Sequence, residues 1–139
     1  MSVLVDTSIW SQAFRRRDIG EASDDVLELR ELIAGGNAIM IGPVRQELLS
    51  GIRDWSQFEA LRDRVRAFPD ERLETVDFEL AAEHFTKCRQ NGIQGSNIDF
   101  LICSIAERLQ VAIFTSDNDF VNFSKHLPIR LHRSRPHEN

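Results

Sequence analysis

The sequence predicts an α/β fold with a central parallel sheet of four to five strands and helices on both faces. Short apolar runs rich in β-branched residues alternate with longer segments that carry apolar residues at helical spacing. That alternation is typical of chains that return to one parallel sheet after each helix. No repeat, low-complexity tract or linker divides the 139 residues, and 42% of them are hydrophobic, which fits one domain with its own core.

The strands are expected where short apolar runs end at an acidic or turn-forming residue. The first run is followed by Asp6, and the second by Gly42 and Pro43. The expected strands cover residues 2–5, 38–41, 73–76, 111–115 and 128–131.

The helices are expected where apolar residues recur three or four positions apart. Ser23 is a candidate N-cap for a helix that two glycines end at positions 35–36. Pro43 occupies the favoured first position of the next helix. Asp77 is expected to cap a later helix that ends at Gly92. Besides the helix that begins around Pro43, the expected helices cover residues 8–14, 24–34, 55–68, 78–91 and 97–109.

Residues 1–132 are expected to form the single domain, and residues 133–139 a polar, frayed C-terminal tail. No segment resembles a secretion signal, and no apolar run is long enough to span a membrane, so we expect a cytoplasmic protein without membrane contact. Cys88 and Cys103 are expected to be reduced thiols packed on their helices, with a disulfide as the alternative.

The charge balance bears on nucleic-acid binding. The chain has 17 basic and 22 acidic residues, a formal net charge of −5. This argues against a protein that binds nucleic acid by bulk electrostatic attraction, because such proteins are usually basic. It does not exclude a protein whose carboxylates surround divalent cations, since each ion reverses the local field.

Two acids follow predicted strands. Asp6 lies at the carboxyl end of the first strand, and Asp117 just beyond the fourth. In open parallel sheets, sites form beyond the carboxyl ends of strands, where the strand order reverses. If the first and fourth strands are neighbours, Asp6 and Asp117 face the same crevice.

Two further acids lie on predicted helices. Glu47 shares a helical face with Val44 and precedes Leu48, so it is expected to interrupt an apolar stripe, where a carboxylate is costly unless paired or bound to a cation. Asp99 lies in the first turn of its helix. Four carboxylates that converge without lysine partners predict a cation among them, and oxygen ligands favour Mg²⁺ or Mn²⁺ over zinc.

Each acid also has a purely structural interpretation. Asp6 alone is explained as a helix cap, and Asp99 as a first-turn acid favoured by the helix dipole. Glu47 can pair with Arg45 or Arg53, and the acids at 117 and 119 can cap a short helix through position 123. Their joint arrival at one end of one sheet favours the metal site.

Four segments together resemble a PIN domain, with the VapC-type toxins of bacterial toxin–antitoxin pairs as the nearest subgroup. No single segment is specific, but their order and spacing extend over roughly residues 3–131. One departure is that residues 94–97 do not have the commonest family form, which leaves the loop shape and substrate choice open. The four segments are residues 6–8, 42–47, 97–102 and 115–120.

The resemblance implies an endoribonuclease that uses one or two Mg²⁺ or Mn²⁺ ions to activate water and stabilise charge on the phosphate. It also implies an RNA substrate, a cognate antitoxin and a homodimer. Asp6, Glu47, Asp99 and Asp117 match the family's acidic quartet. The positions that match a more variable fifth acid and two supporting hydroxyls are Asp119, Thr7 and Thr115.

Other features have two interpretations. The basic run Arg15–Arg17 either contacts phosphates or is a solvated charge cluster. The helix with Trp55 and Phe58 covers the core, and the resemblance adds a role in the dimer and in an antitoxin groove.

Two competing functions remain open. A magnesium-dependent phosphatase would need a second Asp two residues after Asp6, where the sequence has Ser8. The absence of a glycine-rich phosphate loop argues separately against a nucleotidase or kinase. The non-enzymatic alternative is a catalytically silent PIN-like module that binds RNA or protein.

Overall fold

The computed structural model describes residues 1–14 and 22–136, so the basic run Arg15–Arg17 lies outside the described residues. The described residues form seven helices and four strands. In chain order these are β1 (Val3–Val5), α1 (Thr7–Phe14), α2 (Asp24–Ala34), β2 (Ala38–Ile41), α3 (Gly42–Ser50), α4 (Trp55–Val65), β3 (Asp70–Glu71), α5 (Thr75–Gln90), α6 (Asn97–Leu109), β4 (Ala112–Phe114) and α7 (Asp119–Ser124).

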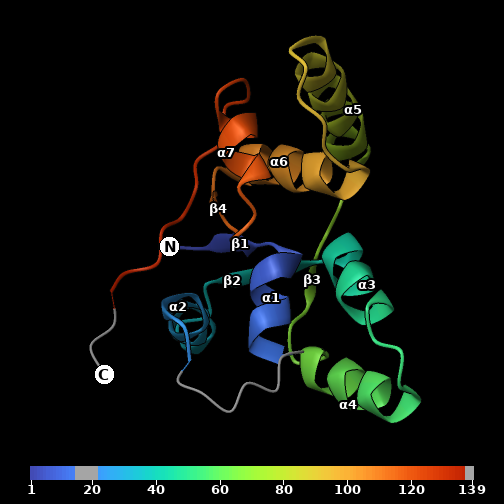
Figure 1. The fold of residues 1–139 in the computed structure, drawn as a ribbon, viewed down its shortest axis with the longest axis vertical. Helices are drawn as coiled ribbons and strands as arrows, with labels where there is room; N and C mark the ends of the chain where they lie inside the picture. Colours follow the sequence, from blue (N-terminus) through green and yellow to red (C-terminus); the bar gives the residue numbers. More distant parts are fainter. Residues whose placement is uncertain (15–21, 137–139) are drawn as a thin grey trace.

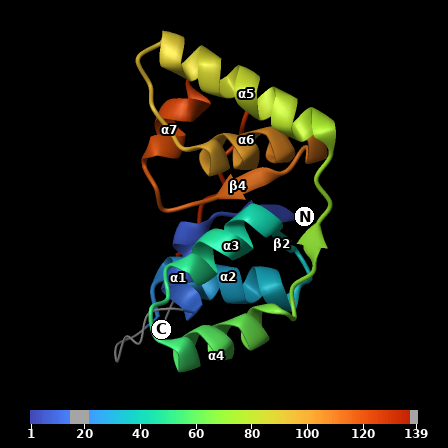
Figure 2. The ribbon, with the colours of Figure 1, turned by 90° about the vertical axis from the view of Figure 1, so that its right-hand side faces the viewer.

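The strands form one sheet in the order β3-β2-β1-β4, and each pairing is parallel. Helices α1–α4 lie on one side of the strands and α5–α7 on the other, as Figures 1 and 2 show from two directions. The predicted fold class is therefore confirmed, with four strands. The strand order reverses between β1 and β4, which are neighbours, so the condition for Asp6 and Asp117 to face one crevice is met.

The third strand differs from the prediction. It covers Asp70 and Glu71 rather than residues 73–76, and Val76 already belongs to α5. Arg45 on α3 explains the shift, because its guanidinium donates to the Asp70 carboxylate at 3.0 Å and to the carbonyls of Val65 and Phe68. These contacts between distant residues hold the chain beside β2 earlier than local sequence indicates. Helix α4 ends at Val65, whose carbonyl accepts one of these hydrogen bonds, three residues before the predicted end.

The start of α5 also needs a correction. Glu74 is the N-cap, whereas Asp77 is the third helical residue and completes a capping box. Its carboxylate accepts a hydrogen bond from the Glu74 amide at 2.8 Å. Asp77 is buried and also accepts two hydrogen bonds from Arg108 on α6, at 2.7 and 3.0 Å. Asp77 therefore joins α5 to α6 as well as starting the helix.

The predicted fifth strand is reduced to a single parallel bridge between Ile113 and Leu131 in the described part of the chain. Residues 131–136, here called the C-terminal strap, continue along α2. Glu28 of α2 is only 2% exposed, and it accepts hydrogen bonds from His132 Nε2 at 2.8 Å and from the Arg135 amide at 3.4 Å. Arg135 also pairs with Glu31. The C-terminal strap therefore contacts α2 as far as Arg135.

The core fills the space between the sheet and the two helix layers, and it includes every residue of β1. Cys88 and Cys103 are both buried and free, as predicted for reduced thiols. Among the residues that the structure describes, no helix is long and apolar enough to cross a membrane.

Gly95 allows the loop before α6 to lie close against the core residues Phe100 and Phe123. A Cβ at this position would lie 2.6 Å from Phe123 Cζ and 3.0 Å from the ring of Phe100, and both rings are fully buried. We expect Gly95→Ala to lower the free energy of unfolding by about 1–3 kcal/mol, because the rings cannot move aside without repacking. Urea denaturation measures the change.

Gly42→Ala is the matched control, since the nearest atom to its added Cβ is Asp70 Oδ2 at 3.9 Å. We expect this variant to stay within about 0.5 kcal/mol of the parent protein. Equal stability of the two variants would show that the Gly95 contact does not limit packing.

Candidate functional site

Asp6 is the first residue after the central strand β1, and its side chain is 5% exposed. Its backbone amide donates to the carbonyl of Phe114 at 2.9 Å, which ties the end of β1 to β4. Two hydroxyls donate to the same carboxylate oxygen, Oδ2: Ser8 Oγ at 2.9 Å and Thr115 Oγ1 at 2.7 Å. The carboxylate is therefore buried and held in one orientation.

The same hydroxyls fix the turn after β4. The amide of Ser116 donates to Ser8 Oγ at 3.1 Å, and the amide of Asp117 donates to Thr115 Oγ1 at 3.0 Å. The Asp117 carboxylate in turn accepts from the amide of Asp119 at 2.9 Å, at the start of α7. Hydroxyl groups thus connect the turn that carries Asp6 to the turn that carries Asp117.

Asp99 is placed by the start of α6. Its carboxylate accepts from the Ser96 amide at 2.9 Å, and its own amide donates to Ser96 Oγ at 3.1 Å, which completes a capping box. The structural interpretation of Asp99 as a first-turn acid is therefore correct. It does not exclude a second role, because the electrostatic neighbours of Asp99 include two other acids.

The site is acidic and partly dehydrated. Burial raises the pKa of Asp6, its hydrogen bonds to Thr115 and Ser8 oppose the rise, and the like charge of Glu47 adds to it. Burial also raises the pKa of Asp99, against the hydrogen bonds from Ser96, and the like charges of Asp6 and Asp117 raise it further. These four carboxylates therefore lie within one electrostatic neighbourhood. None of them takes part in the ion pairs formed by the described residues.

Glu47 does not occupy the position that its sequence spacing predicted. The structure places it on the exposed side of α3, while Val44 and Leu48 are buried. The argument that Glu47 interrupts a buried apolar stripe is therefore wrong. Arg45, one candidate partner for Glu47, binds Asp70 instead. What connects Glu47 to the site is its like-charge interaction with Asp6.

The remaining predicted positions differ in their contacts. Thr115 donates a hydrogen bond to the Asp6 carboxylate. Asp119 is exposed, and its backbone amide donates to the Asp117 carboxylate. Thr7 Oγ1 is buried and, alone among buried side-chain polar atoms of residues 1–14 and 22–136, has no hydrogen-bond partner. Sequence reasoning missed the part played by Ser8, although its place two residues after Asp6 was a usable signal.

The residues fit a hard divalent cation. In the described parts of the chain, no three His, Cys, Asp or Glu side chains are arranged to hold a metal ion. Like-charge interactions nevertheless connect the acids, because Glu47 raises the pKa of Asp6, and Asp6 and Asp117 raise the pKa of Asp99. Mg²⁺ is often held by one or two carboxylates, with water and phosphate completing the shell, so a closed cage is not required. The all-oxygen donor set and the unpartnered Thr7 hydroxyl agree with this fit.

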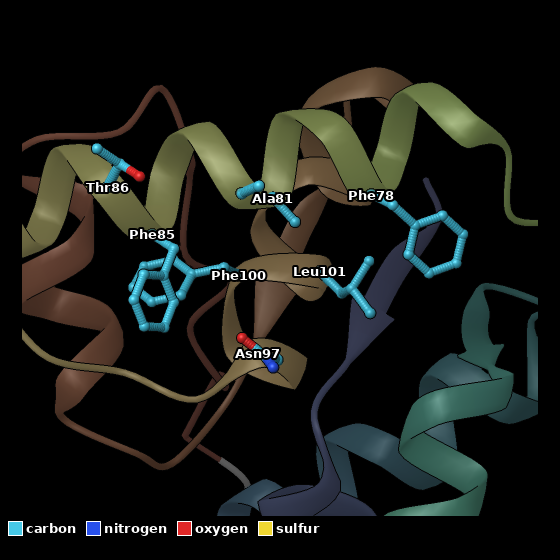
Figure 3. A pocket seen from close by; sticks show the side chains of 8 residues that line it. Phe78, Ala81, Phe85, Thr86, Asn97, Phe100 and Leu101 are labelled. Atoms are coloured by element: carbon cyan, nitrogen blue, oxygen red, sulfur yellow. The ribbon is translucent and has the colours of Figure 1, made fainter.

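Two of the hollows in the described part of the chain differ in the chemistry of their linings. One, of about 380 Å³, lies between α5 and α6; its lining is mostly apolar and contains no carboxylate. Figure 3 shows Phe78 and Phe85 of α5 and Phe100 and Leu101 of α6 around it. The other, of about 300 Å³, is mostly polar and includes Asp117 in its lining. Of these two hollows, the second is the one whose lining contains carboxylates and a histidine.

The raised pKa of Asp6 predicts the pH dependence of stability. The folded state binds a proton more tightly than the unfolded chain, so ionisation lowers stability as pH rises through the unfolded and then the folded pKa. Asp6→Asn removes this charge and keeps an oxygen that accepts from Ser8 and Thr115. In EDTA at pH 7 we expect the variant to melt a few degrees higher than the parent, and the difference to vanish below about pH 4.

Asp77→Asn is the control with the opposite sign. Burial opposes ionisation of Asp77, but Arg108 and the Glu74 amide outweigh it, so the pKa of Asp77 is lowered. The stabilisation from ionised Asp77 is present at neutral pH and is lost as pH falls through its folded pKa. The Asn variant should therefore be less stable than the parent at pH 7. Calorimetric melting at several pH values compares the two, and destabilisation by Asp6→Asn at pH 7 would contradict the electrostatic account.

Comparisons with known proteins agree with this architecture. A search of curated proteins found no significant match. The structure of FitAcB from Neisseria gonorrhoeae is similar with a TM-score of 0.75 at 17% identity, over 95% of this chain and 97% of that one. VapBC2 from Rickettsia felis, bound to a DNA fragment from their promoter, has a TM-score of 0.75 at 20% identity, over 95% and 98%. A toxin–antitoxin complex from Klebsiella pneumoniae has a TM-score of 0.58 at 19% identity, over 86% and 90%.

At these identities the solved structures establish a shared fold. The sequence itself matches the family model of the PIN domain over residues 3–125. This match covers most of the chain and confirms the resemblance seen in the four sequence segments. The chain belongs to the PIN-domain family.

Proposed function

We propose that this protein is a metal-dependent endoribonuclease that hydrolyses phosphodiester bonds of RNA, and that it is the toxin of a toxin–antitoxin pair. The observation that carries the proposal is the acidic group at the reversal point of the sheet, where the pKa values of Asp6 and Asp99 are raised without a cationic partner in the described residues. Membership of the PIN-domain family supports a nuclease. The toxin–antitoxin complex among the similar structures supports the biological role.

In this proposal Asp6 and Asp99 hold a Mg²⁺ or Mn²⁺ ion most directly. Asp117 binds the ion directly or through water, and Glu47 does the same or orients the attacking water. When bound, the cation makes a coordinated water more acidic and offsets negative charge on the phosphate. Exposed Asp119 is a further candidate ligand.

The surrounding groups hold the acids in place. Ser8 and Thr115 donate to Asp6, which favours the ionised form that a cation needs and prevents rotation of the carboxylate. The capping box between Ser96 and Asp99 orients the second acid relative to α6. Burial of Asp6 reduces competition from bulk water at that carboxylate. The protein thus supplies oriented carboxylates, and the cation supplies the positive charge that the described residues do not.

Cleavage of single-stranded RNA in Mg²⁺ or Mn²⁺, abolished by EDTA and restored by the metal, is the direct test. The same assay on a phosphomonoester substrate addresses the phosphatase alternative, which predicts release of phosphate and no internal cuts. RNA binding without cleavage in either metal would favour the catalytically silent module and refute the enzyme.

Substitution of the two central acids tests the site. Asp6→Asn and Asp99→Asn should each reduce cleavage by more than about 100-fold, since even partners outside the metal shell are worth roughly 10–100-fold. Asp63→Asn is the matched control, because Asp63 is an exposed acid on α4 that pairs with Arg62 and Arg66. Initial rates on a labelled RNA measure the effect, and melting curves establish that the variants fold. Undiminished cleavage by either site variant would remove that residue from the site.

The proposal includes a homodimer and a cognate antitoxin. Trp55 is 67% exposed and stacks on Phe58 at a ring distance of 5.1 Å, so α4 presents an aromatic surface. If this surface forms the dimer, Trp55→Ser should lower the mass measured by light scattering to that of a monomer. Phe78→Ser, which removes an aromatic side chain that is 52% exposed on α5, should leave the mass unchanged. The reverse outcome would place the interface on α5, and a monomeric parent protein would refute the dimer.

A further inference from the structure

The polar cavity beside the acidic group has two walls from distant parts of the sequence. Its volume is about 300 Å³. The turn after β4 provides Ser116, Asp117 and Asn118, and the C-terminal strap provides Arg133 and Ser134. The cavity therefore shares one carboxylate with the candidate active site.

The wall formed by the strap is held in place on both sides of Arg133. Before it, Leu131 forms a bridge with Ile113, and the His132 ring packs edge-on against Phe114 at 5.2 Å. His132 Nε2 also lies 2.8 Å from the Glu28 carboxylate. After it, the amide of Arg135 donates to Glu28. The backbone that carries Arg133 is consequently fixed before any ligand binds.

Arg133 is the basic side chain of the C-terminal strap that can bind a ligand in the cavity. Burial opposes ionisation of Glu28, but hydrogen bonds from His132 and Arg135 outweigh it, and the pKa of Glu28 is lowered. His132 and Arg135 are therefore both engaged with a buried carboxylate. Arg133 is exposed and forms no ion pair within the described parts of the chain, although Asp25 and Asp117 line the same cavity. A planar guanidinium with free donors suits a phosphate group.

We propose that this cavity binds the nucleotide adjacent to the scissile phosphate of single-stranded RNA. Arg133 binds the phosphate of that nucleotide, and the polar side chains of Ser116 and Asn118 face its ribose or base. The cavity volume is at the lower end of ligand pockets, so it accepts one splayed-out nucleotide rather than a duplex. This inference rests on the proposed function, because Asp117 belongs to both sites.

Binding in EDTA tests the subsite without cleavage. The probe is a 5′-labelled single-stranded RNA of ten nucleotides, and fluorescence anisotropy measures its affinity for the full chain. Arg133→Gln should weaken binding about tenfold, as expected for loss of a charged hydrogen bond. The slope of log K against log salt concentration should also become shallower by about 0.7, the value of one phosphate contact on a single strand.

Arg30→Gln is the matched control. It removes one positive charge from an exposed position on α2 that does not line the cavity. We expect less than about a twofold change in affinity, because an exposed charge outside the cavity lining does not contact the bound phosphate and is weakened by salt. Equal effects of the two substitutions would overturn the subsite.

Competition by small molecules separates a nucleotide site from a simple anion site. Adenosine and uridine 5′-monophosphate should displace the RNA at lower concentrations than inorganic phosphate does, and this advantage should disappear in Arg133→Gln. Equal competition by inorganic phosphate would overturn the nucleotide proposal.

The outcomes also separate the subsite from the proposed function. If Arg133→Gln weakens RNA binding but the unsubstituted protein does not cleave RNA in Mg²⁺ or Mn²⁺, the nuclease is refuted and an RNA-binding site remains. Metal-dependent cleavage with no Arg133 effect refutes the subsite and leaves the nuclease.

Discussion

A carboxylate buried at the end of the central strand is the constraint on which the rest of the site depends. Removing a charge from water is costly, and Asp6 is compensated by two hydroxyl donors rather than by a cation among the described residues. One donor, Ser8, belongs to the start of α1, and the other, Thr115, follows β4, so both reach the carboxylate because β1 and β4 are neighbours. The sheet order is thus a condition for the chemistry as well as for the fold.

The same chain handles other buried acids differently. Asp77 is paired with Arg108, and Glu28 with Arg135 and a histidine, and the pKa of each is lowered. Asp6 has no such partner, and its pKa is raised. Among the described residues, the buried carboxylates of Asp77 and Glu28 are therefore paired with arginines, whereas that of Asp6 is held by hydroxyl donors alone. That contrast supports the proposal of a cation site at Asp6.

Local sequence predicted much of this arrangement. The positions of Asp6 and Asp117 followed from strand ends, and α6 covers the predicted residues 97–109, with Asp99 in its first turn. Glu47 was misplaced, because it precedes the buried Leu48 by one residue and so points about 100° away from it around the helix. Such a position on a short helix is settled only when the helix docks on the sheet.

Contacts between distant residues account for the other differences. The short β3 depends on Arg45, and no local pattern around residues 70–76 shows this. The C-terminal strap depends on Glu28, which is more than one hundred residues away in sequence. In both cases a polar segment is held in place because it forms hydrogen bonds with a charged side chain on another element, Arg45 on α3 or Glu28 on α2. Composition alone cannot distinguish such a segment from a free one.

Under the proposed function, the C-terminal strap bears on how an acidic protein attracts RNA. With a net charge of −5, the chain as a whole repels a polyanion, so attraction has to be local. A cation at the acidic group and the guanidinium of Arg133 would supply positive charge at two places, the candidate active site and the cavity that Asp117 shares with it. Two local charges at fixed positions favour one register of the RNA backbone, whereas a uniformly basic surface would allow many. The acidic composition therefore fits a nuclease that selects its cleavage position by a few anchored contacts.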